Sequence, residues 1–134
     1  MNIRVVLTGG MNEEELISSL VSRMKTEPVN YTGKFSLSEL AALYQKADVF
    51  VSNSTGPLHI AAMMGTPVVA FYPPIIQCSP TRWGPCTEKK KIYCGTSAQC
   101  SLCTGGPCRS NVCMDQITVE QVLGGIRELL NEKK

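Results

Sequence analysis

The sequence predicts an α/β fold in which helices cover both faces of a parallel sheet, giving three layers. Two observations support this prediction. Short apolar runs rich in β-branched residues recur along the chain, and segments whose apolar residues follow a helical spacing lie between them. Strands that alternate with amphipathic helices pair in parallel, because each helix returns the chain to the same end of the sheet. At 134 residues, 43% of them hydrophobic, the chain has the size of one domain.

The N-terminal part of the chain supplies two predicted strands and one helix. Residues 4–8 form a β-branched apolar run that stops at Gly9 and Gly10, which is typical of a buried strand followed by a tight turn. Asn12 is a candidate cap for the next helix, whose first turn carries three glutamates. The predicted core face of this helix comprises Leu16, Ile17, Leu20, Val21 and Met24. Residues 29–31 predict a second, short strand.

The middle of the chain repeats the pattern. Ser36 and Glu39 have the spacing of a capping box in front of a second helix. Its apolar stripe comprises Leu37, Leu40, Ala41 and Tyr44. A strand is predicted at residues 49–51. Pro57 then suits the first turn of a third helix, and Gly65 suits its end.

The last third of the chain contains regular segments on either side of an irregular one. Residues 67–71 predict a buried strand, and Thr118 with Gln121 predicts a capping box before the final helix. That helix is expected to present Val119, Val122, Leu123, Ile126 and Leu130 to the core. Residues 73–115 are rich in Cys, Pro, Gly and Ser and show little periodicity. An irregular segment of that length is uncommon in a compact domain, so we expect it to be functional, crosslinked or packed against another part.

Charge and hydropathy exclude several classes of protein. Thirteen basic and eleven acidic residues give a net charge of +2, too small to indicate a nucleic-acid or membrane partner. No apolar run approaches the roughly 20 residues that span a bilayer. The first residues lack the layout of a signal peptide, because Gly9 and Gly10 interrupt the apolar stretch. We therefore expect a cytoplasmic protein with no nucleic-acid partner and at most peripheral contact with a membrane.

The turn between residues 52 and 57 is the strongest candidate for a binding site. It follows a predicted strand and precedes a helix, and in parallel sheets such turns lie at the edge where ligands bind. A helix N-terminus offers N–H groups and a partial positive charge to an anion. Gly56 permits close approach of a phosphate, Thr55 adds a hydroxyl, and His59 lies one turn further along the same helix. The alternative is that Ser54, Thr55 and Gly56 only cap the helix and that His59 is structural.

Short motifs run through the chain in a fixed order. They are TGK, SL, ELAALY, KAD, FVSN, TGPLHIAA, GTPVVAFYPP and RWGPC. Their order, from Val5 to the last helix, strongly resembles glycosyltransferase family 9, the bacterial lipopolysaccharide heptosyltransferases. The sharpest part of the resemblance is residues 55–59 together with residues 65–68. The resemblance implies the GT-B arrangement, in which two Rossmann-like domains face each other and the C-terminal domain holds most of the nucleotide-sugar donor.

The resemblance implies that residues 1–134 are this donor-binding domain, with a Cys-rich loop at residues 78–113. The implied donor contacts are Ser54, Thr55, Gly56, Pro57, His59, Gly9, Gly10 and Lys34. The implied reaction transfers a sugar, in this family a heptose, from a nucleotide diphosphate donor to a lipopolysaccharide-core acceptor, with ADP-heptose as a candidate donor and no cofactor. Ser54 stands where the family commonly has an acidic residue.

The acceptor domain, which carries the family's catalytic base, is expected to lie outside this chain, as are the first strand and helix of the donor domain. No catalytic residue is therefore assigned here. We expect the chain by itself to bind the donor without transferring the sugar.

Seven cysteines, all between residues 78 and 113, support a second hypothesis. An odd number without an export signal argues against a disulfide framework. Four of them, with the spacing C-x2-C-x4-C-x4-C, have the number and type of ligands for a structural zinc ion: Cys100, Cys103, Cys108 and Cys113. The alternative for this segment is a structural loop without metal, in which Cys78, Cys86 and Cys94 are small apolar residues. The rival function is a non-catalytic, zinc-stabilised module that binds nucleic acid or a protein through this loop.

Overall fold

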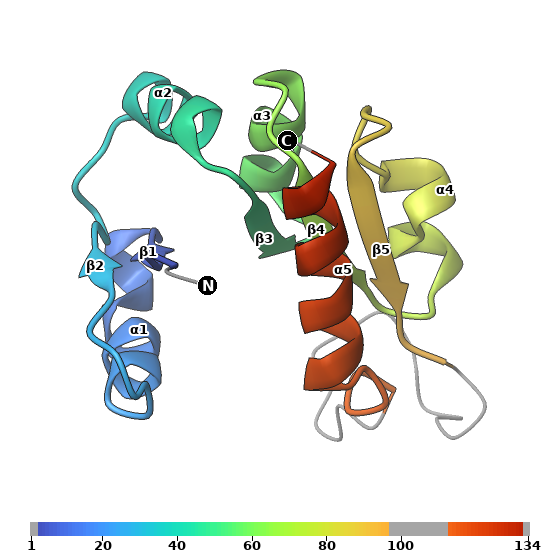
Figure 1. Cartoon of the computed structure of the whole chain (residues 1–134), viewed down its shortest axis with the longest axis horizontal. Helices are drawn as coiled ribbons and strands as arrows, with labels where there is room; N and C mark the ends of the chain where they lie inside the picture. The colour runs from blue at the N-terminus through green and yellow to red at the C-terminus, as the bar shows by residue number, and fades with distance from the viewer. Residues whose placement is uncertain (1–2, 97–112, 133–134) are drawn as a thin grey trace. The chain divides into compact units, whose positions relative to one another are not determined.

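The computed structural model describes residues 3–96 and 113–132. It divides into two compact units, Met1–Leu40 and Ala41–Lys134, and helix α2 (Leu37–Lys46) begins in the first and ends in the second (Figure 1). All pairs of neighbouring strands in both units are parallel. The α/β class predicted from the alternation of strands and helices is therefore confirmed, with the described strands forming two sheets.

The first unit is a small parallel βαβ arrangement. Strand β1 (Val6–Leu7) pairs with β2 (Val29–Asn30), and helix α1 (Glu14–Val21) connects them. A 3₁₀ turn (Met11–Glu13) precedes α1, so the helix begins later than the sequence predicts. The Asn12 cap is wrong: Glu13 occupies the N-cap position of α1, and its carboxylate caps no amide of that helix but accepts the Gly10 N–H at 2.8 Å.

Helix α1 buries less of its predicted apolar face than expected. Ile17 is buried, whereas Leu16 and Leu20 are 70% and 48% exposed. The reason is geometric, because a helix of two turns on a two-stranded sheet has room to cover only one narrow stripe of side chains.

The second unit holds a three-stranded parallel sheet in the order β3-β4-β5. Its elements after α2 are β3 (Phe50–Asn53), α3 (Gly56–Met63), β4 (Val68–Tyr72), a 3₁₀ turn (Ile76–Cys78), α4 (Pro80–Trp83), β5 (Lys90–Cys94) and α5 (Val119–Asn131). Helix α5 lies in front of this sheet and α3 behind it, so the predicted three layers are present in this unit (Figure 1).

Strand β4 forms the centre of the core. Successive side chains of a strand point to opposite faces, and Val68, Val69, Ala70 and Tyr72 are all fully buried. Both faces of β4 are thus covered, as the unbroken apolar run at residues 67–71 predicts. Tyr44, at the end of α2, is also buried, and its backbone carbonyl accepts the Thr66 hydroxyl at 2.6 Å.

The irregular segment predicted at residues 73–115 contains regular structure that the sequence did not reveal. Helix α4 and strand β5 both lie inside it, and β5 pairs with β4 over its whole length. The strand was missed because its sequence, KKIYC, has two lysines where a buried strand has apolar residues. As the outermost strand of its sheet it can carry them, and Lys91 forms an ion pair with Glu128 of α5.

The final helix begins where the sequence predicts, and its buried face is shifted from the predicted one, with Val122, Ile126 and Leu130 half-buried. Thr118 and Gln121 form the predicted capping box. Leu129 and Gly125 are buried, whereas two members of the predicted core stripe, Val119 and Leu123, are 68% and 43% exposed. A methyl group on Gly125 would lie 2.2 Å from the Tyr93 hydroxyl, so a glycine is needed for this close approach.

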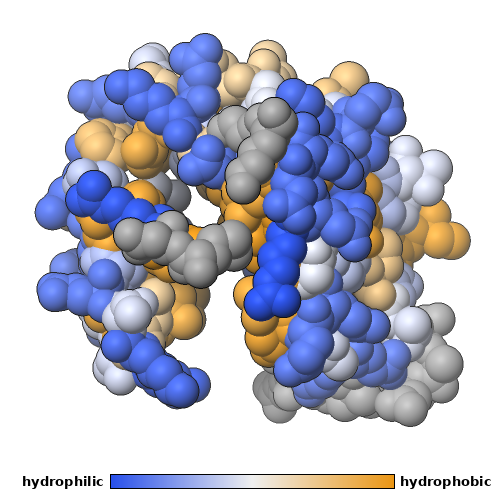
Figure 2. All heavy atoms as spheres, in the orientation of Figure 1, coloured by the Kyte–Doolittle hydropathy of each residue, from blue (hydrophilic) through white to orange (hydrophobic). Residues whose placement is uncertain are grey.

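The surface of α5 that faces the viewer is mostly hydrophilic, as expected for a helix with one face on a sheet (Figure 2). Two further sequence predictions are confirmed in other helices. Ser36 and Glu39 form their capping box, which lowers the pKa of Glu39, and Gly65 ends α3 in the left-handed region with φ of 79°. Leu37, expected in the core, is 65% exposed. Among the described residues, none of the helices has the length and hydropathy required to cross a bilayer.

Candidate functional site

The turn after β3 places a backbone donor at the N-terminus of α3. Thr55 occupies the N-cap position with extended backbone, but its side chain caps no amide of the helix. Its hydroxyl instead donates to the Asn53 carbonyl at 3.4 Å and lies 3.2 Å from the Ser52 hydroxyl. The alternative in which this turn serves only as a side-chain cap therefore lacks its defining hydrogen bond.

The first turn of α3 leaves the Gly56 N–H available. Leu58 donates to the Thr55 carbonyl at 3.1 Å, and Pro57 has no N–H. Within the described residues, no acceptor takes the Gly56 N–H. Apart from its chain neighbours and its own helix, a methyl group built on Gly56 would meet no atom within 4 Å, so the space beside the Gly56 Cα is open. One unpaired donor and the positive end of the helix dipole thus point in the same direction.

Gly56 lines a cleft of about 630 Å³ at the carboxyl ends of β3 and β4. The parallel register sets Asn53 beside Phe71, which brings the two strand ends together. One wall, here called the turn wall, consists of Asn53, Ser54, Thr55, Gly56 and His59. The other lining residues, here called the apolar wall, are Phe71, Pro73, Cys78, Trp83 and Met114. Four predicted site residues therefore share one cleft, whereas Pro57 does not line it.

Tyr72 connects the two walls through hydrogen bonds of its hydroxyl. Its side chain is fully buried, and its hydroxyl donates to the Trp83 carbonyl at 2.7 Å. Burial raises the pKa of Tyr72, and a hydrogen bond with the Ser54 side chain partly opposes this shift. A single neutral phenol thus contacts the turn on one side and α4 on the other, which fixes the spacing of the walls.

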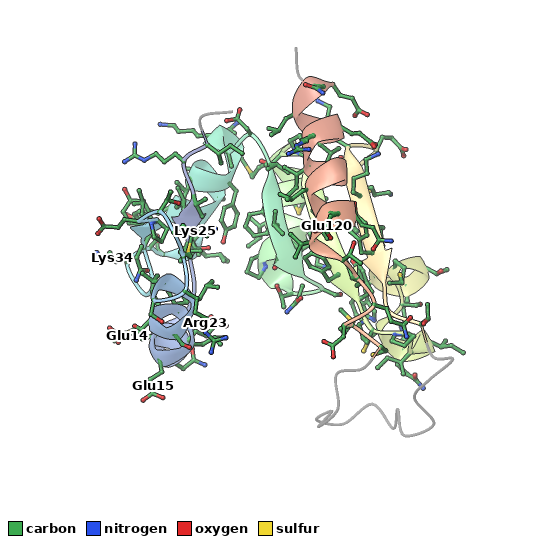
Figure 3. The ribbon with its side chains drawn as sticks, turned by 60° about the horizontal axis from the view of Figure 1, so that its bottom comes forward. Glu14, Glu15, Arg23, Lys25, Lys34 and Glu120 are labelled. Atoms are coloured by element: carbon green, nitrogen blue, oxygen red, sulfur yellow. The ribbon has the colours of Figure 1, made fainter. Side chains whose placement is uncertain are left out.

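The other predicted donor contacts lie in the first unit. Gly33 donates to the Gly9 carbonyl at 2.8 Å, so the turns that follow β1 and β2 are adjacent. The Gly10 N–H is already bound by the Glu13 carboxylate. Lys34 is exposed on the surface of this unit (Figure 3). The expected contacts of Gly9, Gly10 and Lys34 with a nucleotide stay a prediction.

Most of the proposed zinc ligands lie outside the described residues. These are Cys100, Cys103 and Cys108. Cys113 is a buried free thiol, and the described residues contain no group of three or more side chains that could hold a metal ion. Cys86 and Cys94 are exposed, which corrects the expectation that they are ordinary apolar residues, and Cys78 lines the cleft.

Sequence reasoning identified the turn wall and left most of the apolar wall unassigned. Trp83 follows the Tyr-Pro-Pro end of β4 in the sequence, and that proximity was the available signal. Phe71 follows from the parallel register once β3 and β4 are known to pair. Met114 carries no signal in the sequence, because only the folding of the chain after β5 brings it to the cleft.

A parallel sheet with a cleft at its carboxyl edge and a helix N-terminus in that cleft is the arrangement of Rossmann-like domains. The chain belongs to glycosyltransferase family 9: the family model described as glycosyltransferase family 9 (heptosyltransferase) matches residues 1–113.

Individual relatives agree with this assignment. The lipopolysaccharide core heptosyltransferase OpsX of Haemophilus influenzae is 36% identical over 73 residues, which are 53% of this chain and 21% of that protein. Lipopolysaccharide heptosyltransferase 3 of Escherichia coli is 34% identical over 71 residues, 51% of this chain and 21% of that protein.

Solved structures share the fold. The family 9 glycosyl transferase of Veillonella parvula superposes with a TM-score of 0.79 at 28% identity, covering 96% of this chain and 37% of that one. The E. coli ADP-heptose lps heptosyltransferase II superposes with a TM-score of 0.77 at 22% identity, covering 98% and 38%. The chain thus spans less than two fifths of these structures and about a fifth of the two curated relatives.

Proposed function

We propose that this chain is the part of a glycosyltransferase that binds a nucleotide-diphosphate sugar, and that the reaction transfers a heptose to the lipopolysaccharide core. Family membership and the names of the relatives support the reaction class. ADP-heptose is the donor we propose, since it is named for one structure of the same fold. The acceptor would be bound by a part of the enzyme outside this chain.

The chemistry of this transfer matches the turn wall. The leaving group is a nucleoside diphosphate, so negative charge builds up on its phosphate oxygens as the bond to the sugar breaks. Preorganised donors aimed at such charge are usually the largest catalytic contribution of a protein. Gly56, Thr55 and His59 all line the cleft at the N-terminus of α3. We propose that the Gly56 N–H, the α3 dipole, the Thr55 hydroxyl and the His59 side chain bind that diphosphate.

The observation that carries the proposal is the Gly56 N–H, which lacks an acceptor among the described residues and belongs to a residue that lines the cleft at a helix N-terminus. The rival zinc-stabilised module has no support from the family match or from the described residues.

Gly56→Ala tests the proposal, with Gly124→Ala of α5 as its matched control. Both changes add one methyl group to a helical glycine with no atom within 4 Å, and only Gly56 lines the cleft. Neither variant should melt below the unaltered chain, because alanine favours a helix over glycine by up to about 1 kcal/mol. Calorimetric titration with ADP should show at least tenfold weaker binding by Gly56→Ala and unchanged binding by Gly124→Ala. Equal affinities in both variants would refute the site.

A further inference from the structure

We propose that Trp83 forms the sugar-binding surface of the cleft, with its exposed indole face stacked against the ring of the donor sugar. This inference rests on the proposed function and adds the part of the site that recognises the sugar. It begins from Trp83 itself, a large aromatic residue that lines the cleft and stays 50% exposed.

The backbone at Trp83 is held in a single short turn. The N–H groups of Arg82 and Trp83 both donate to the Ser79 carbonyl, at 3.1 and 2.9 Å. A methyl group on the next residue, Gly84, would lie 2.4 Å from the Pro80 carbonyl oxygen, so glycine is required where the chain leaves α4. The RWGP sequence therefore fixes the position from which the indole projects.

The side chain of Trp83 is also fixed, and its polar atom is already satisfied. The indole Nε1 donates to the Gln77 carbonyl at 2.9 Å, and the Trp83 carbonyl accepts the Tyr72 hydroxyl. The Arg82 guanidinium lies 5.7 Å from the centre of the ring. What the indole offers to the cleft is thus its apolar surface, held in place before any ligand arrives. Preorganised aromatic surface binds at low entropic cost.

The make-up of the two walls points to a sugar. A sugar ring has an apolar face of C–H groups and a rim of hydroxyls. It therefore fits an aromatic face opposite polar side chains. Trp83 supplies the face, and Asn53 and Ser54 on the turn wall supply hydrogen-bonding groups for the rim. A nucleobase would need partners for its polar edge, and Pro73 and Met114 beside Trp83 have almost no capacity for hydrogen bonds.

The sequence provides a direct probe, because Trp83 is the only tryptophan of the chain. Its intrinsic fluorescence should change saturably when the full chain is titrated with ADP-heptose. ADP, which lacks the sugar, should bind with a much smaller change. Saturable binding of ADP-heptose by calorimetry with no change in tryptophan emission would overturn the inference.

Substitutions extend this test to affinity. Trp83→Ala should weaken ADP-heptose binding by about three- to tenfold, the range expected for loss of one aromatic contact, and should leave ADP binding within about twofold. Trp83→Phe should recover most of the loss. Met63→Ala, which shortens a side chain that is 83% exposed and does not line the cleft, is the control and should match the unaltered chain.

Each other outcome has a defined meaning. An equal loss of affinity for ADP and ADP-heptose in Trp83→Ala would mean that the nucleoside contacts this wall. Unchanged affinity for both ligands would mean that Trp83 is not part of the site. Both results overturn the inference and leave the proposed function standing. Failure of the unaltered chain to bind either ligand would overturn the proposed function and this inference together. If Trp83→Ala does not fold, the Trp83→Phe variant and the fluorescence titration still decide.

Discussion

The two walls of the cleft offer different chemical groups to a ligand, backbone groups on one and side chains on the other. In the proposed site the turn wall would bind through the backbone, with an amide at Gly56 and the dipole of α3, and with the Thr55 hydroxyl in the same turn. The apolar wall would bind through side chains, chiefly the indole of Trp83. A backbone amide donates whatever the side chains around it are, but a methyl group added at that glycine blocks the close approach of the ligand. A side-chain site instead depends on the size and shape of one residue. The first suits a diphosphate that every donor shares, and the second suits the sugar that distinguishes donors.

Among the changes that test this difference between the walls, we expect loss of the Thr55 hydroxyl to lower ligand affinity the most. In the proposed complex the Thr55 hydroxyl turns from the Asn53 carbonyl to a phosphate oxygen. Thr55→Ala then removes a hydrogen bond to a charged phosphate, worth about 1.5–3 kcal/mol, or about one to two decades in Kd. ADP and ADP-heptose should lose the same factor, because both contain the diphosphate. Thr55→Ser keeps a hydroxyl and should lose much less. Since Thr55 is exposed and caps no amide, thermal melting of both variants should change by little.

Calorimetry of the two Thr55 variants with ADP, paired with thermal melts, separates the binding role from a capping role. A drop in melting temperature with unchanged ADP affinity would restore the interpretation of this turn as a helix cap.

The turn wall could be predicted from the sequence because its residues are close together in the chain. A strand, a polar turn, a glycine and a proline follow one another within residues 50–57, and that order alone places an amide at a ligand-binding edge. The capping boxes at Ser36 and Thr118 were predictable for the same reason, because each involves residues three positions apart.

The apolar wall depends on contacts between distant residues and was not predictable in this way. Trp83 reaches the cleft because Tyr72 holds its carbonyl and because β5 completes the sheet beneath it. Strand β5 itself was not predicted, because its two lysines interrupt the apolar pattern of a buried strand. The face of α5 was mispredicted because Gly125, which has no side chain to count as apolar, is the residue that touches Tyr93.

We expect a smaller loss of affinity when the Tyr72 hydroxyl, which links the two walls, is removed. Tyr72→Phe removes the hydroxyl that binds the Trp83 carbonyl. Tyr93→Phe removes a comparable hydroxyl, which donates to the Gln121 carbonyl at 2.7 Å on the other face of the sheet. Each variant should lose about 1 kcal/mol of unfolding free energy in urea. Only Tyr72→Phe should weaken ADP-heptose binding, by a few fold, because only that hydroxyl positions Trp83.

Titration of both tyrosine variants with ADP-heptose distinguishes a positioning role from general stability. Equal losses of affinity in the two variants would show that Tyr72 acts only through the stability of the fold.

The central claim, that the Gly56 amide binds the diphosphate, is tested most directly by amide NMR of the full chain during titration with ADP. We expect the Gly56 amide proton to move downfield with a saturating dependence on ADP, as an N–H does when it donates to a phosphate oxygen. The Gly124 amide, in a helix that does not line the cleft, should stay where it is. Saturable ADP binding that leaves the Gly56 amide unshifted, with perturbations confined to other parts of the chain, would contradict the claim.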